Sequence, residues 1–167
     1  MSSEYDYLIA LLKSGDIAKL EEAADVVDHF PDGCDDFSGS HWVINAIDQG
    51  CLASIEWMLN KGVDLSFRGD DGYTPLLSAI DRAGADRYAV IALLIEHGAP
   101  LNKRGINDWT ALHLAAARQD VAALKLLIEA GADPAVKTRI DDYRNPLEEA
   151  RALGWQASVA YLESIEE

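Results

Sequence analysis

Cysteine and long apolar runs are scarce in this chain of 167 residues. The two cysteines, Cys34 and Cys51, form no CxxC pair, so neither a disulfide framework nor a zinc knuckle is indicated. No apolar stretch approaches the roughly 20 residues that span a bilayer, and the apolar run at 7–12 is too short for a signal peptide. These absences predict a cytoplasmic protein with reduced thiols and no membrane segment.

Positive charge is scarce as well. The chain has 14 Lys+Arg against 29 Asp+Glu, which gives a formal net charge of −15 at pH 7. A surface this negative repels the phosphates of nucleic acids and anionic lipids, and it attracts basic partners. The apolar share of 49% is typical of a globular protein. We therefore expect one folded domain over residues 1–167 that binds neither nucleic acid nor membrane.

Motifs for catalysis and metal binding are missing. No phosphate-binding glycine loop and no Gly-x-Ser-x-Gly elbow occurs. His29 and His41 have no nucleophile and acid at an interpretable spacing. The acidic segment 25–36 lacks the residue order of a calcium loop and is predicted to be a solvated loop. We expect no catalytic residue, no metal and no cofactor, and so a protein that is not an enzyme.

The strongest signal is an internal repeat. The segments 72–79 and 108–115 read Gly-Tyr-Thr-Pro-Leu-Leu-Ser-Ala and Asp-Trp-Thr-Ala-Leu-His-Leu-Ala, and each is followed by an apolar run that ends at a glycine. A weaker copy runs from 38 to 64. His41 of this weaker copy and Thr74 of the next are 33 residues apart, which is the period of a known repeat architecture. The copy that begins at residue 72 carries three extra residues at about 83–87.

These residues resemble the ankyrin family, whose repeat reads G-x-T-P-L-H-x-A-A followed by L-L-x-x-G-A-D. The resemblance covers nearly the whole chain. It implies an all-α solenoid of about five helix-turn-helix units, with protruding β-turn fingers and degenerate capping repeats. The approximate units are 1–36 as the N-terminal cap, 37–69, 70–104, 105–138, and 139–167 as the C-terminal cap.

The helix boundaries expected from elementary chemistry agree with this resemblance. Thr74 and Thr110 each precede an apolar helical run, where a hydroxyl can cap free backbone N–H groups. Pro75 lies just inside such a start, where its missing N–H costs nothing. Gly98 and Gly131 follow the second helices, where a left-handed residue ends a helix.

The resemblance also implies a docking surface, made of the turn tips and the adjoining face of each first helix. Transferred position by position, the tip residues are Phe37, Ser40, Asp70, Asp71, Tyr73, Ile106, Asn107, Trp109, Arg139, Asp141, Asp142, Tyr143 and Arg144. The helix-face residues are Asp48, Gln49, Asp81, Arg82 and Arg118. Tyr, Trp and Arg are typical anchors of protein interfaces.

Several of these aromatic and histidine positions have an alternative role. Tyr73 and Trp109 either anchor a partner or shield neighbouring turns within the stack. The remaining tryptophans, Trp42, Trp57 and Trp155, are predicted to pack into the core. His113 occupies the histidine position of the repeat, where the resemblance implies a structural hydrogen bond between adjacent turns.

The function expected from the resemblance is binding of another protein, with a basic surface on the partner and a monomeric free form. The chain is similar to short bacterial ankyrin proteins, some of which are immunity proteins that neutralise a toxin or enzyme. The alternative is a general scaffold, adaptor or regulator that tethers partners without inhibiting them. Fold alone does not decide between these.

Overall fold

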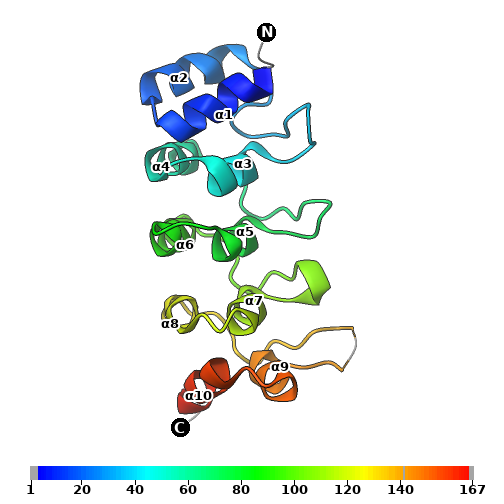
Figure 1. The fold of residues 1–167 in the computed structure, drawn as a ribbon. Helices are drawn as coiled ribbons and strands as arrows, with labels where there is room; N and C mark the ends of the chain where they lie inside the picture. Colours follow the sequence, from blue (N-terminus) through cyan, green and yellow to red (C-terminus); the bar gives the residue numbers. More distant parts are fainter. Residues whose placement is uncertain (1–3, 141, 166–167) are drawn as a thin grey trace.

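The computed structural model describes residues 4–140 and 142–165, which contain helices and loops but no strand longer than an isolated bridge. Helix pairs stack in one row, and loops project from one side of that row (Figure 1). The helices are α1 (Glu4–Ser14), α2 (Ile17–Val26), α3 (Trp42–Gln49), α4 (Leu52–Asn60), α5 (Pro75–Asp81), α6 (Arg87–Glu96), α7 (Ala111–Ala117), α8 (Val121–Glu129), α9 (Pro146–Leu153) and α10 (Gln156–Ser164). The predicted all-α ankyrin solenoid is confirmed.

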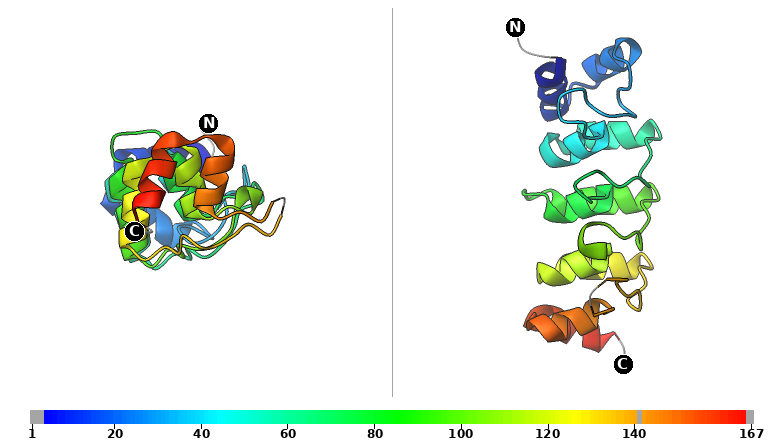
Figure 2. Two further views of the ribbon diagram at one scale, coloured as in Figure 1. Left: turned by 90° about the horizontal axis from the view of Figure 1, so that it is seen from below. Right: turned by 90° about the vertical axis from the view of Figure 1, so that its right-hand side faces the viewer.

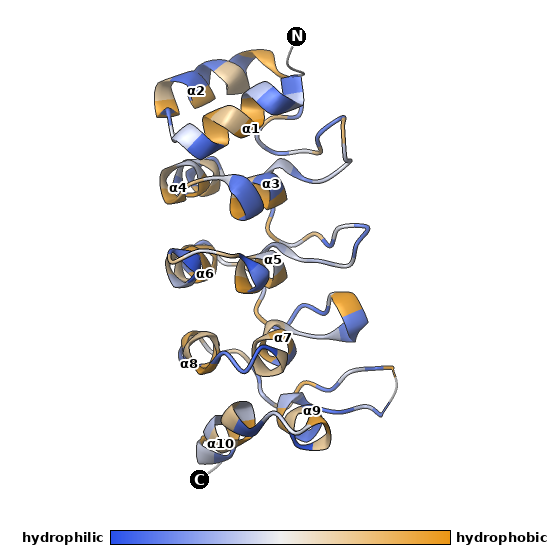
Figure 3. Ribbon diagram, viewed as in Figure 1, coloured by the Kyte–Doolittle hydropathy of each residue, from blue (hydrophilic) through white to orange (hydrophobic). Residues whose placement is uncertain are grey.

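Four fingers form the projecting side of the stack. We define them as finger 1 (33–41), finger 2 (67–74), finger 3 (103–110) and finger 4 (137–145). Each is closed by a backbone hydrogen bond across its base, such as Gly69 N to Tyr73 O at 2.8 Å and Gly105 N to Trp109 O at 2.8 Å. Finger 3 carries a short 3-10 turn, η1 (Ile106–Asp108), at its tip. The fingers are mainly hydrophilic (Figure 3).

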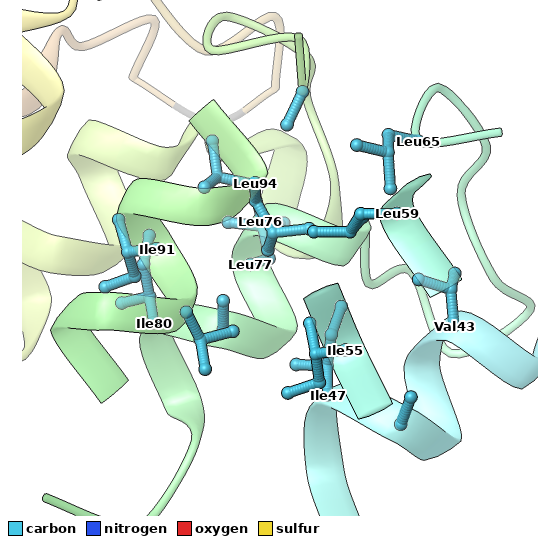
Figure 4. Close-up of a cluster of buried hydrophobic side chains, with 14 of the residues drawn as sticks. Val43, Ile47, Ile55, Leu59, Leu65, Leu76, Leu77, Ile80, Ile91 and Leu94 are labelled. Atoms are coloured by element: carbon cyan, nitrogen blue, oxygen red, sulfur yellow. The ribbon is translucent and has the colours of Figure 1, made fainter. Parts of the chain in front are cut away.

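The hydrophobic core is continuous along the stack, because each helix pair buries its apolar face against its neighbours. Ile47 and Ile55 of the second pair belong to the same cluster of buried side chains as Leu77 and Ile91 of the third (Figure 4). Trp42 and Trp57 are buried as predicted, and Trp155 is half-buried against the same core. No helix among the described residues is long and apolar enough to cross a bilayer.

The helix ends follow the predicted chemistry. The Thr74 hydroxyl accepts a hydrogen bond from Leu77 N at 3.3 Å, and Pro75 is the first residue of α5. Thr110 and His113 form a capping box at the start of α7. Gly98 and Gly131 have φ values of 81° and 93°, so these helix-ending positions need a residue that tolerates the left-handed region.

The three extra residues of the third unit lie in the loop between α5 and α6, on the side opposite the fingers (Figure 2). This loop starts with Arg82, whose side chain is only 7% exposed. Its guanidinium donates to the carbonyls of Ile47 and, at 2.8 Å, Gly50, and it pairs with Asp86 at 2.9 Å. The prediction that Arg82 faces a partner is therefore wrong. Free carbonyls at the end of α3 need donors, and Arg82 supplies them.

Candidate functional site

The predicted docking residues lie mostly on one surface, which we call the finger face: the four fingers with the helices that follow them. Three hollows on this face collect most of them. Ser40, Asp70 and Asp71 border the first hollow, Asp48, Asp71, Tyr73 and Asp81 the second, and Asn107, Trp109, Asp142 and Arg144 the third. Phe37 lies on finger 1, beyond these three hollows.

The second hollow, which we call the acidic hollow, has a volume of about 190 Å³ and lies between two successive units. Asp48 enters it from α3, Asp71 from finger 2, and Asp81 from α5. Tyr73 also lines it and donates a hydrogen bond from its hydroxyl to Asp81 Oδ2 at 2.6 Å. Arg118 Nη2 lies 2.8 Å from the other oxygen of Asp81. Five residues predicted from the sequence thus meet in one place.

The acidic hollow holds more negative charge than nearby cations neutralise. Burial raises the pKa of Asp48, and the charges of Asp71 and Asp81 raise it further, although Arg82 acts in the opposite direction. The hydrogen bond to Asp81, with burial, raises the pKa of Tyr73 to about 12. Among the described residues, neither Asp48 nor Asp71 forms an ion pair. A cation brought into this hollow would relieve that repulsion.

The third hollow, of about 290 Å³, has the opposite character because its charges are paired. Arg144 lies 2.6 Å from Asp142 and 3.4 Å from Glu149. Beside it, Arg139 contacts Asp108 at 2.7 Å and holds the pKa of that carboxyl below its usual range. These ion pairs join fingers 3 and 4 to each other and to α9.

The first hollow, of about 210 Å³, lies between fingers 1 and 2. It is lined by His41, whose ring stacks on Phe67 with centroids 3.6 Å apart. Asp70 and Asp71 line it as well and make it acidic. It therefore continues the negative surface of the neighbouring acidic hollow.

Other predicted residues take up internal contacts. Gln49 donates to the Tyr5 hydroxyl at 3.3 Å, and Ile106 packs against the core beneath finger 3. Trp109 is half-buried and meets Trp155 edge-on, with ring centroids 6.1 Å apart. This packing favours the shielding role for Trp109. Tyr143 is exposed, and Asp141 lies outside the described residues.

His113 has the structural role that the resemblance implied. Its ring is fully buried, and Nδ1 accepts from Thr110 N at 3.3 Å. The opposite nitrogen, Nε2, therefore carries the proton and donates to the carbonyl of Arg144 at 3.1 Å in the next unit. Burial lowers the pKa of His113 and keeps it neutral at pH 7.

Asp35 and Tyr5 are site residues that sequence reasoning missed. Segment 25–36 is not simply a solvated loop, because Asp35 is only 2% exposed. Its carboxylate accepts from Phe37 N at 2.9 Å and from Asn45 Nδ2 at 2.8 Å, which ties finger 1 to α3. The Asp-x-x-Ser spacing at 35–38 was the available signal, since such side chains commonly bond to nearby backbone N–H groups. Tyr5 had no signal of this kind.

In the described part of the chain, no three or more His, Cys, Asp or Glu side chains lie close enough together to bind a metal ion.

Residues 41–138, more than half of the chain, match the family described as ankyrin repeats (3 copies). The chain therefore belongs to the ankyrin-repeat family. It is 37% identical over 99 residues to the ankyrin repeat and KH domain-containing protein mask-1 of Caenorhabditis elegans, a match that covers 59% of this chain and 4% of that protein. It is 38% identical over 92 residues to SH3 and multiple ankyrin repeat domains protein 2 of Homo sapiens, covering 54% and 5% respectively.

A third relative is the B-cell lymphoma 3 protein homolog of Mus musculus, 29% identical over 108 residues, with 64% of this chain and 23% of that protein covered. The chain thus spans less than a quarter of the length of each of these relatives. Ankyrin repeats mediate binding to other proteins, and the fold is generally non-catalytic. The class of function defined by fold and family is protein–protein interaction.

Proposed function

We propose that this chain binds a basic protein through its finger face and neutralises it, as an immunity or inhibitor protein does. The observation that carries the proposal is the acidic hollow, where Asp48, Asp71 and Asp81 converge with few cations to balance them. A basic active-site cleft on a toxin or enzyme would complement this surface and lose access to its substrate. In this proposal the chain itself is not an enzyme, is monomeric when free, and acts in the cytoplasm.

The chemistry of capture is charge-assisted hydrogen bonding. Lysine or arginine side chains of the partner would donate to Asp48 and to Asp71, whose Oδ1 also accepts a hydrogen bond from Tyr73 N at 2.9 Å. Tyr73 supplies a rigid ring beside them, held by its bond to Asp81. The long-range field of a chain with net charge −15 would also speed the encounter with a positive surface.

The alternative is a scaffold or adaptor that tethers partners without inhibiting them. The observation that favours it is the form of the relatives, in which the matched repeats are less than a quarter of a longer protein. An adaptor would leave the bound partner's activity unchanged, and this outcome separates the two functions.

The test is capture of partners from a lysate, followed by an activity assay on the captured protein. We compare the wild-type chain with the double variant Asp48→Asn/Asp71→Asn, which keeps side-chain shape and removes two charges. The control Asp25→Asn/Asp28→Asn makes the same charge change at exposed positions near the end of α2. We expect one basic partner whose affinity falls at least about tenfold in the first variant alone, which corresponds to about 1.4 kcal/mol.

Two results would contradict the proposal. One is a captured partner with an acidic surface, and the other is equal loss of affinity in both variants, which would indicate only a general charge effect. A basic partner whose activity is unchanged at saturation would support the adaptor instead.

A further inference from the structure

A separate hollow lies at the N-terminal end of the finger face. We call it the aromatic notch; it is lined by Glu4, Tyr5, Asp36, Phe37 and Trp42 and has a volume of about 250 Å³. It lies where the start of α1 meets finger 1, at the end of the row of fingers (Figure 1). Most of its lining is aromatic, which distinguishes it from the acidic hollow.

The rings of the notch are held in place before any partner arrives. Phe37 is 78% exposed, yet its backbone N–H is bonded to the buried Asp35 carboxylate. The Tyr5 ring lies 5.1 Å from Phe37 and 6.0 Å from Trp42, centroid to centroid. An exposed ring on a fixed turn loses little conformational entropy on binding, which is the property of an interface anchor.

The two carboxylates of the notch favour binding of a cation. Glu4 and Asp36 border the rings, and among residues 4–140 and 142–165 neither forms an ion pair. Aromatic faces are negative, so a cation placed over them is attracted by the rings and by the carboxylates together. A purely apolar side chain would bury the rings but leave both carboxylates beside it without a partner.

We propose that the aromatic notch receives an arginine side chain of the protein that the finger face binds. The planar guanidinium can stack on Phe37 or Tyr5 while its N–H groups donate to Glu4 and Asp36. Lysine is less suited because its ammonium is a strongly hydrated point charge without a flat face. This inference rests on the proposed function only in taking the partner to be a basic protein.

The test uses blocked single amino acids, so it needs no knowledge of the partner. We titrate the full chain with N-acetyl-arginine N-methylamide and follow backbone amide shifts by heteronuclear NMR. The lysine and leucine analogues are titrated in parallel. We expect the largest shifts at residues 4–5 and 35–42, with the arginine probe binding at least about threefold more tightly than lysine and leucine the weakest.

Two variants should weaken arginine binding at least about fivefold: Phe37→Ala, which removes the exposed ring, and Glu4→Gln/Asp36→Asn, which removes the charges. The matched controls are Tyr7→Ala, which removes an exposed ring of α1 outside the notch, and Glu22→Gln/Asp25→Asn on α2. Both controls should bind like the wild-type chain. Unchanged thermal unfolding of Phe37→Ala would show that lost binding is not lost folding.

Shifts elsewhere than the notch, equal affinity for leucine or lysine, or equal weakening in variants and controls would each overturn the inference. A failed lysate capture with intact arginine binding would count against the proposed function alone. Capture of a basic partner without any response to the blocked arginine would count against the notch alone.

Discussion

The N-terminal and C-terminal halves of the molecule share one architecture but treat charge differently. Residues 1–80 contain four of the 14 lysines and arginines but fifteen of the 29 acids, and residues 81–167 contain the remaining ten and fourteen. On the finger face of the first half, Asp48 and Asp71 have no ion pair with a described residue. In the second half, Asp108, Asp142 and Glu149 each contact an arginine.

The comparison separates carboxylates that stabilise the stack from those that are available to a partner. A paired carboxylate that loses its charge loses an ion pair inside the fold, whereas Asp48 and Asp71 have no ion pair to lose within the part of the chain that the structure describes. Folding alone would favour the paired arrangement throughout the molecule. The unpaired acids of the first half are therefore the better candidates for binding.

The largest expected effect concerns the cation at the boundary of the two halves. Arg82→Met should lower the free energy of unfolding by about 3 kcal/mol, because it leaves the carbonyls of Ile47 and Gly50 without donors inside the fold. Urea denaturation measures this. Arg139→Met, which removes an exposed arginine of finger 4, should lower the free energy of unfolding much less. Equal losses in the two variants would remove the distinction between buried and surface cations.

Two aromatic residues offer the next test, one in each half. Trp109→Ala should lower stability by about 2 kcal/mol, because the half-buried ring packs on Trp155 and the core. Phe37→Ala should change stability by less than about 0.5 kcal/mol, since that ring is mostly in water. Melting temperatures of the two variants give the answer. A destabilised Phe37→Ala would mean that this ring belongs to the fold rather than to a binding surface.

We expect His113, in the second half, to make the free energy of unfolding depend on pH. Its folded-state pKa is lowered by burial, so between pH 7 and pH 5 the unfolded chain takes up a proton that the folded chain resists. Stability contributed by neutral His113 is therefore present above the ordinary histidine pKa and falls as pH drops below it. Guanidinium unfolding at several pH values should show a shallower fall in His113→Gln. An identical fall in the variant would assign the effect to other groups.

The smallest effect has opposite signs in the two halves. Asp48→Asn should raise stability by up to about 0.5 kcal/mol at pH 7, because the pKa of Asp48 is raised and its ionised form is disfavoured in the fold. Asp108→Asn should lower stability by a similar amount, because Arg139 and Arg104 favour the ionised form there. Differential scanning calorimetry can compare both. A stability change of the same sign in both variants would contradict the proposed difference between the two halves.

The fold could be predicted because the sequence features that specify it act over only a few residues. Thr74, Pro75 and the helix-ending glycines specify helix boundaries within a few residues, and the period repeats them. The candidate site was less predictable, because exposure depends on contacts between units. Arg82 and Asp35 are charged residues that look solvent-facing in the sequence, yet both are buried to satisfy backbone or side-chain groups of α3 and finger 1. Tyr5 joins the notch only because α1 packs beside finger 1.

The loop between α5 and α6 has a consequence for how the protein unfolds. Arg82 donates to carbonyls of the second unit, and Arg87, the first residue of α6, lies 2.7 Å from Asp120 of the fourth. In a linear array, cooperativity is set by the interfaces between nearest neighbours. The third unit therefore makes polar side-chain contacts with the units on both sides and couples the stability of the two halves. We expect the two halves to unfold in one transition, although their net charges differ.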